Sequence, residues 1–162
     1  MAMPRNPTTI TAAAGEHFVA ALLAAKGYTV ALTRGGTPGT DLLVANRSGT
    51  KTISIQVKTS NWARREYKKK KENNHYEWPI PWGCDQIDNE NYWYAFVDLR
   101  SWPDGEDFPE VFFVPSSTVA SQVRYEKENK WSRSFFEIRE GEVQKYREER
   151  GLIQRILGPP NG

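Results

Sequence analysis

The chain has 162 residues, with 22 Lys and Arg against 20 Asp and Glu, and a formal net charge of +2. This length provides material for one hydrophobic core of useful size but not for two. Hydrophobic residues at 38% and charged residues at 26% exclude a disordered chain, a collagen-like chain and a coiled coil. Because the charge is nearly balanced, any nucleic-acid-binding role must come from where the charges lie.

Cys84 is the only cysteine, which excludes an internal disulfide and a cysteine-ligated zinc site. We expect it to be a small packed thiol in a protein of the reduced cytoplasm. The longest apolar stretches, such as residues 18–25, are too short to cross a membrane. The N-terminus does not resemble a secretory signal, so no membrane partner is expected.

The first predicted element is a helix over residues 10–26, which Gly27 stops. At 100° per residue, Val19 and Leu23 belong to its apolar side. Glu16 falls at the edge of that side. The helix therefore combines one face suited to a core with a carboxylate at the margin of that face.

Three strands are predicted next, over residues 28–33, 41–45 and 51–59. A glycine-rich loop separates the first two, and a short turn separates the last two. The third strand alternates clearly, with Ile55 and Val57 on one face and Gln56 and Lys58 on the other. Asp41 opens the second strand.

Residues 61–90 have little periodicity and predict a long loop or a partly ordered insertion that is basic and rich in aromatic residues. Two buried strands, a helix, a short strand or docking segment, and a final helix are predicted over residues 92–99, 111–114, 116–127, 135–138 and 142–157. This order of elements predicts a single α/β domain over residues 1–162, with a central mixed β-sheet flanked by helices.

Four polar side chains in the first third of the chain suggest a chemistry: Glu16, Asp41, Gln56 and Lys58. Side-chain oxygens of Asp41 and Gln56, with the backbone carbonyl of Val57, form an oxygen-only ligand set that suits Mg²⁺ or Mn²⁺. Lys58 projects from the same strand face as Gln56. Beside such an ion it would orient or deprotonate an attacking water, or offset charge at phosphorus. The set predicts hydrolysis of a phosphodiester.

This arrangement resembles the PD-(D/E)XK nuclease superfamily, which includes many restriction enzymes and the archaeal Holliday-junction resolvases. The resemblance is carried by the helix with Glu16, the Thr40-Asp41 strand opening and Gln56-Val57-Lys58. It implies a restriction-endonuclease-like fold and a Mg²⁺-dependent (or Mn²⁺-dependent) DNA endonuclease of repair, recombination or defence. It also implies Asp41 and Gln56 as metal ligands, Lys58 as the catalytic lysine and Glu16 as an additional carboxylate.

More widely, residues 36–59 with 94–99 and 113–116 resemble a group of small uncharacterised bacterial proteins of this superfamily. A homodimer follows by analogy, because cutting both strands with one small site requires two copies. RNA as an alternative substrate stays open.

Gln56 departs from the superfamily pattern, which has an acid at this position. The amide keeps one oxygen ligand but removes one negative charge. A catalytically weakened module that retains the fold and binds nucleic acid or another protein is therefore the alternative. Taken singly, each of the four residues has a commoner structural role, such as a solvated helix residue for Glu16 or a turn residue for Asp41. Their combined pattern favours the functional interpretation.

The segment 64–71 contains six basic residues and one acid. The basic residues are Arg64, Arg65, Lys68, Lys69, Lys70 and Lys71. They form either a solvated charge block or a contact for DNA phosphates directly after the metal-binding strand. Trp62 and other flanking aromatic residues either stack on bases or dock the segment on the domain. Arg34 is a further candidate for a phosphate contact.

The two histidines, His17 and His75, lie far apart in the sequence and have no metal-ligand spacing, so neither is assigned a role. The glycine-rich loop over residues 35–39 lacks both the P-loop lysine and the dinucleotide fingerprint. The sequence therefore predicts no nucleotide cofactor.

Overall fold

The structure is a computed structural model that describes residues 8–34, 39–147 and 151–160. The first half contains α1 (Thr8–Ala25), β1 (Thr29–Leu32), β2 (Leu42–Ala45), β3 (Thr52–Ser60), β4 (Arg64–Arg65), the 3-10 helix η1 (Lys71–Asn73), β5 (His75–Pro79) and the 3-10 helix η2 (Trp82–Gln86). The second half contains β6 (Tyr92–Asp98), β7 (Glu110–Pro115), α2 (Ser116–Glu128), β8 (Phe135–Arg139), the 3-10 helix η3 (Glu140–Glu142), α3 (Val143–Tyr146) and α4 (Leu152–Leu157).

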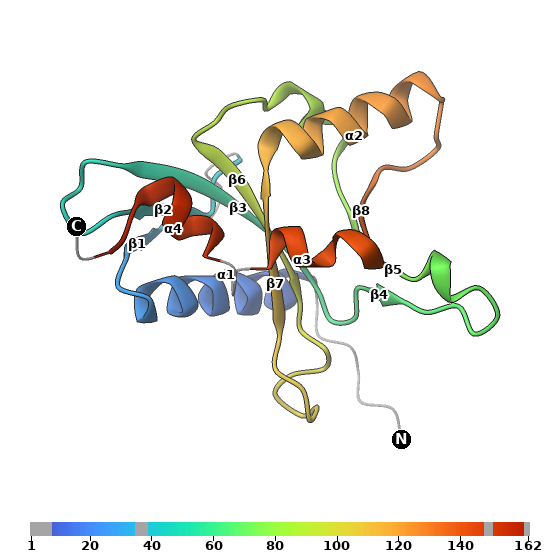
Figure 1. The fold of residues 1–162 in the computed structure, drawn as a ribbon, viewed down its shortest axis with the longest axis horizontal. Coiled ribbons are helices and arrows are strands. Elements are labelled where there is room, and N and C mark those ends of the chain that lie inside the picture. The colour runs from blue at the N-terminus through green and yellow to red at the C-terminus, as the bar shows by residue number, and fades with distance from the viewer. Residues whose placement is uncertain (1–7, 35–38, 148–150, 161–162) are drawn as a thin grey trace.

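The strands form two sheets. The first has the order β1-β2-β3-β6-β7, in which β3 and β6 are parallel and the other neighbours are antiparallel. The second is antiparallel, with the order β4-β5-β8. Helices α1 and α2 pack on the first sheet, and the strands of the second sheet lie beside α3 (Figure 1). The predicted mixed sheet flanked by helices is confirmed.

One hydrophobic core lies between α1 and the first sheet. The alternation predicted for β3 is present, since Ile55 and Val57 are buried in this core together with Val19 and Leu23 of α1. Burial of such aliphatic side chains stabilises a fold by roughly 1.5–3 kcal/mol each. The opposite face of β3 carries Gln56, which is consequently directed away from this core.

A second core covers the other face of the first sheet and contains the side chains of β5, β8 and α2. Tyr76 and Trp78 of β5 are fully buried there, and the Trp78 Nε1–H donates a hydrogen bond of 2.9 Å to the Val97 carbonyl. Cys84 is also buried in this core as a free thiol, as predicted.

The prediction of a loop or partly ordered insertion over residues 61–90 was therefore wrong in its local structure. This segment contains β4, β5, η1 and η2. Within β5 the burial alternates strictly, but the strand pairs with β8, about 60 residues further along the chain. Prolines and the lysine run on either side conceal this alternation in the sequence.

The predicted final helix over residues 142–157 was also wrong, because two short helices stand in its place. After α3, Arg147 is extended and forms a β-bridge with Phe112 of β7. Gly151, which precedes α4, has a φ of 65°, in the left-handed region that favours glycine. Residues 148–150 of the predicted helix lie outside the described residues.

Helix α1 is long and apolar enough, by length and composition alone, to cross a membrane, with a mean hydropathy of 1.2 over 18 residues. The expectation that every apolar stretch is too short was therefore wrong on this criterion. In the structure, α1 buries Thr11, Gly15, Val19 and Leu23 against the first sheet, which is the placement of a core helix.

Candidate active site

Asp41 lies at a bend immediately before β2, and its hydrogen bonds reach β3 and the residue that follows β1. Its carbonyl oxygen accepts the Thr33 N–H at 2.9 Å, and its own N–H donates to the Ile55 carbonyl at 3.0 Å. Its Oδ2 accepts the Val57 N–H at 2.7 Å. Backbone and side chain of Asp41 therefore bind the residues on either side of Gln56. This arrangement fixes the carboxylate next to Gln56 and leaves Oδ1 for a further partner.

The Tyr92 side chain binds Gln56 and lies near Asp41. Its hydroxyl donates a hydrogen bond of 3.2 Å to Gln56 Oε1 and lies 3.5 Å from the position that a Cβ would take on Gly39. Burial, followed by the negative charge of Asp41, raises the pKa of Tyr92 to about 12. Tyr92 thus remains a hydroxyl donor at neutral pH and holds the amide oxygen of Gln56 beside Asp41.

Tyr92 was not among the site residues predicted from the sequence. Tyr92 opens β6, which pairs in parallel with β3 so that Tyr92 lies opposite Ser54 and Tyr94 opposite Gln56. Only this pairing places the ring on the face of β3 that carries Gln56. The single available signal was a tyrosine at the start of a strand, which is too common to be informative.

Lys58 lies two residues beyond Gln56 on the same face of β3 and is paired with Phe96 in the register of β6. Its side chain is partly exposed. Among the residues that the structure describes, it forms no hydrogen bond or ion pair. Its ammonium group is therefore not committed to a structural role. Val57, whose backbone carbonyl is a predicted ligand, lies between Gln56 and Lys58.

Glu16 approaches the same region from α1. Gly15, its neighbour, is buried against Thr59 of β3, and a Cβ at position 15 would overlap the Thr59 side chain. This close approach of helix and strand positions Glu16 near Asp41. Burial, and then the negative charge of Asp41, raise the pKa of the Glu16 carboxyl, whereas the charge of His17 lowers it.

The structure therefore brings Glu16, Asp41 and Gln56 together and leaves Lys58 on the strand face that Gln56 shares. Within the described residues, neither Glu16 nor Asp41 forms an ion pair. Two neighbouring carboxylates without a basic partner disfavour each other's charged form, which a bound cation would offset. The donors are all oxygens, so the residues present fit Mg²⁺ or Mn²⁺.

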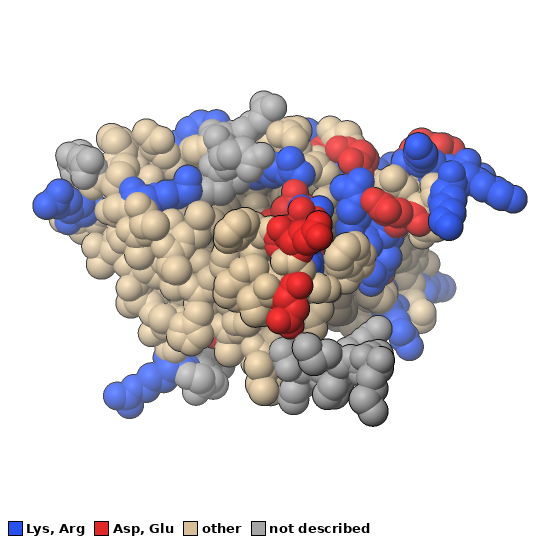
Figure 2. Space-filling model, turned by 90° about the horizontal axis from the view of Figure 1, so that it is seen from below, with Lys and Arg blue, Asp and Glu red and all other residues tan. Residues whose placement is uncertain are grey.

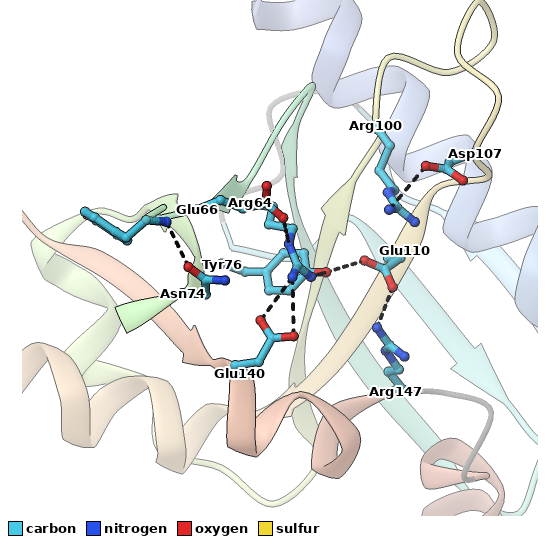
Figure 3. Close-up of polar contacts among 10 residues, drawn as sticks. Arg64, Glu66, Asn74, Tyr76, Arg100, Asp107, Glu110, Glu140 and Arg147 are labelled. Carbon is cyan, nitrogen blue, oxygen red and sulfur yellow. Dashed lines mark hydrogen bonds and ion pairs between the residues drawn. The ribbon is translucent and has the colours of Figure 1, made fainter. Parts of the chain in front are cut away.

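The two arginines of the predicted nucleic-acid-binding segment are engaged within the protein. The Arg64 guanidinium binds Glu66, Glu140 and the Tyr76 hydroxyl, as Figure 3 shows. The Arg65 Nε binds Glu77 Oε1 at 2.6 Å. Both side chains therefore hold the second sheet together through their own ion pairs.

The four lysines that follow are all exposed: Lys68, Lys69, Lys70 and Lys71. Basic side chains project at the right-hand end of the molecule in Figure 2, where Figure 1 places the connection between β4 and β5. Trp62 is 52% exposed, and Arg34 is exposed before the glycine-rich loop, whose residues 35–38 lie outside the described ones. The positive charge that residues 64–71 present to solvent therefore comes from the four lysines.

Comparison with protein families gives a match over residues 8–71 to Mrr_cat, a restriction endonuclease family. The matched residues contain Glu16, Asp41, Gln56 and Lys58. Residues 8–71 are therefore similar to a restriction endonuclease domain of the PD-(D/E)XK type. No protein with curated annotation matches the chain.

Among solved structures, the chain is similar to a bacterial homing endonuclease, I-Ssp6803I. The TM-score is 0.58 at 14% sequence identity, and the alignment covers 93% of this chain and 94% of the other. At this identity the likeness concerns the fold. The family match and the fold together support a nuclease-like domain.

Proposed function

We propose that the chain is a divalent-metal-dependent endonuclease that hydrolyses phosphodiester bonds in DNA. The observation that carries this proposal is the position of Asp41, whose hydrogen bonds to Ile55 and Val57 lie on either side of Gln56. These bonds hold Asp41 beside Gln56, which supports a cation shared by the two side chains. The restriction endonuclease match over the same residues supports it.

In this proposal, Asp41 and Gln56 hold the metal, with the Val57 carbonyl and Glu16 as further oxygen donors. Mg²⁺ or Mn²⁺ bound there would polarise the phosphate and activate a water. The Tyr92 hydroxyl keeps the Gln56 amide oxygen in place. The raised pKa of Glu16 means that its carboxyl holds a proton more readily than an ordinary glutamate does. Its protonation would reduce the negative charge beside Asp41.

Lys58 acts on the nucleophile or on the phosphate. Because it has no ion-pair partner among the described residues, its charge is available to substrate. An ammonium group beside the reacting phosphorus stabilises the negative charge that develops there, and a hydrogen bond from it orients water. Removal of one such group typically lowers a rate about 10²–10³-fold.

The exposed Lys68–Lys71 run and Trp62 provide the DNA contact that we propose. They follow directly on the end of β3, the strand with Gln56 and Lys58, so one continuous segment connects the site to a positive surface. Phosphates pair with such lysines, and an exposed indole stacks on bases. Arg34 contributes on the side of β2, and two copies of the chain would cut both strands of a duplex.

A second candidate function is favoured by Gln56 itself. With an amide in place of the acid, the site has one negative charge fewer, and its affinity for a divalent cation falls unless Glu16 compensates. A protein that keeps the fold and binds nucleic acid without cutting it would have this ligand set. Metal binding separates the two candidates, because only the endonuclease depends on it.

The test is a nicking assay on supercoiled plasmid and on branched DNA, with Mg²⁺ or Mn²⁺ against EDTA. We expect cleavage with metal only, and a rate about 10²–10³-fold lower for Lys58→Ala. Lys51→Ala is the matched control, since Lys51 is exposed just before the same strand. Cleavage by Lys58→Ala at the wild-type rate would refute the mechanism. Binding of DNA without any cleavage, and without Mn²⁺ uptake, would favour the non-catalytic candidate.

A further inference from the structure

The outer face of the second sheet carries a group of metal-ligating side chains. In both β5 and β8 the residues alternate between buried and partly exposed, so His75 and Glu77 of β5 and Glu137 of β8 point away from the core. Glu77 and Glu137 are directly paired across the two strands. One potential ligand atom from each of the three residues lies within 4.8 Å of the others.

The orientation of the His75 ring prepares one nitrogen for a metal. Nδ1 lies 2.8 Å from the Asn73 carbonyl oxygen, and because a carbonyl only accepts, this nitrogen carries the hydrogen. In the neutral ring, Nε2 then presents its lone pair toward Glu77 Oε2, 3.5 Å away. A lone pair facing a carboxylate is unfavourable unless a proton or a cation lies between them. Metal-bound histidines commonly have this hydrogen bond to a backbone carbonyl.

The two carboxylates differ in how they are held. Glu77 Oε1 accepts a hydrogen bond of 2.6 Å from the Arg65 guanidinium. This bond orients the carboxylate and leaves Oε2 directed toward His75. Glu137 is partly buried and has no hydrogen bond or ion pair with the residues that the structure describes. Like charges directly opposite each other in an antiparallel pair are destabilising. A cation between them would remove that repulsion.

We propose that His75, Glu77 and Glu137 bind a transition-metal dication of the Zn²⁺ class. One imidazole nitrogen and two carboxylate oxygens suit Zn²⁺ and leave a fourth position open. Ligand atoms around such an ion lie roughly 3–4 Å apart, which small side-chain rotations achieve from the present spacing. A cleft of about 360 Å³, lined by Tyr67, Asn73, His75 and Arg139 among others, gives access from solvent.

The site is independent of the proposed nuclease centre, because its ligands belong to the second sheet and not to β2, β3 or α1. Metal bound there joins β5 to β8. It also fixes the ring of His75, on which Tyr67 stacks with ring centres 6.0 Å apart. Tyr67 immediately precedes the exposed lysines, so the site lies next to the segment that carries them.

Zn²⁺ titration calorimetry and the visible spectrum of added Co²⁺ test this site, with all measurements made on the full chain in the Asp41→Ala background. That substitution removes the principal ligand of the other site. We expect one equivalent of Zn²⁺ and a rise in melting temperature on adding it. Glu137→Gln and His75→Ala should each weaken binding by at least about 100-fold, and His17→Ala should leave it unchanged. Loss of a ligand exceeds the roughly 10–100-fold cost of losing an outer-shell partner.

Glu137→Gln keeps the shape of the side chain and removes the repulsion from Glu77, so this variant should fold at least as well as the parent without metal. Zn²⁺ affinity equal in the parent and in Glu137→Gln would overturn the proposal. Zn²⁺ bound by the wild type but not by the Asp41→Ala parent would overturn it as well, since the ion would then occupy the other site. A nuclease assay decides neither outcome, so failure of the proposed function leaves this test intact.

Discussion

Polar side chains are arranged differently on the two sheets. On the second sheet, Arg64 and Arg65 are held by carboxylates within the protein, and Tyr76 links this network to Glu110 and Arg147 (Figure 3). Beside the first sheet, Glu16 of α1 and Lys58 of β3 have no ion pair among the described residues, and the hydrogen bond recorded for the Asp41 carboxylate comes from the Val57 backbone N–H. A partly buried charge without a partner reduces the stability of a fold, and such groups are frequent at functional sites.

The largest effect that tests this comparison is expected at Asp41. Asn at this position keeps an oxygen that accepts the Val57 N–H, so the bend before β2 should survive. The charge that binds a cation is lost, and we expect DNA cleavage in Mn²⁺ to fall about 10³-fold with a melting temperature close to that of the wild type. Plasmid nicking and thermal unfolding measure the two quantities. A large drop in melting temperature would show that the charge of Asp41 stabilises the fold.

Two of the three tryptophans in the segment 61–90, Trp62 and Trp78, should behave in opposite ways. Trp78 is fully buried and Trp62 is 52% exposed. Trp78→Ala should lower the free energy of unfolding by about 3–5 kcal/mol, and Trp62→Ala by less than about 0.5 kcal/mol. Urea unfolding followed by circular dichroism measures both. Equal stability of the Trp78 variant and the wild type would mean that β5 does not pack as described.

The third prediction concerns the exposed lysines. Replacement of Lys68–Lys71 by alanine should leave the fold intact, because these side chains are exposed and form no ion pair with described residues. Each phosphate contact contributes about 0.9 to the slope of log affinity against log salt concentration. We expect the slope measured by fluorescence anisotropy on a duplex to decrease by up to about 3.6. An unchanged slope would mean that these lysines do not contact DNA phosphates.

The smallest expected effect is the pH dependence contributed by Glu16. Burial and Asp41 raise the pKa of its carboxyl in the folded protein, so the charged form is disfavoured there relative to the unfolded chain. This penalty is absent below the unfolded pKa and grows as the pH rises through the raised folded pKa. Glu16→Gln should therefore stabilise the protein at pH 7 more than at pH 4. Thermal unfolding in EDTA at the two pH values measures the difference, and a stability gain independent of pH would contradict it.

Much of the first sheet could be predicted because its signals are local. The strict alternation of β3, the apolar side of α1 and the glycine after the helix are properties of a few consecutive residues, and the structure has each of them. The choice of Asp41 and Gln56 as candidate oxygen ligands followed from the same local pattern. Their roles in catalysis stay predictions.

What could not be predicted depends on pairing between distant residues. Tyr92 reaches Gln56 only through the parallel β3–β6 pair, and Glu137 reaches His75 only through the β5–β8 pair. The break between α3 and α4 likewise follows from the bridge between Arg147 and Phe112. Such contacts depend on which strands pair with each other, and no short stretch of the sequence predicts that pairing.

The contact of Gly15 with Thr59 has a consequence for relatives of this protein. Since no atom can be added at the first position without meeting the side chain at the second, the sizes of the two residues are coupled. A homologue with alanine at the position of Gly15 is expected to have a smaller residue opposite it, or a helix displaced outward together with its glutamate. Correlated substitutions at positions 15 and 59 among homologues would therefore indicate how close the Glu16 carboxylate lies to β3.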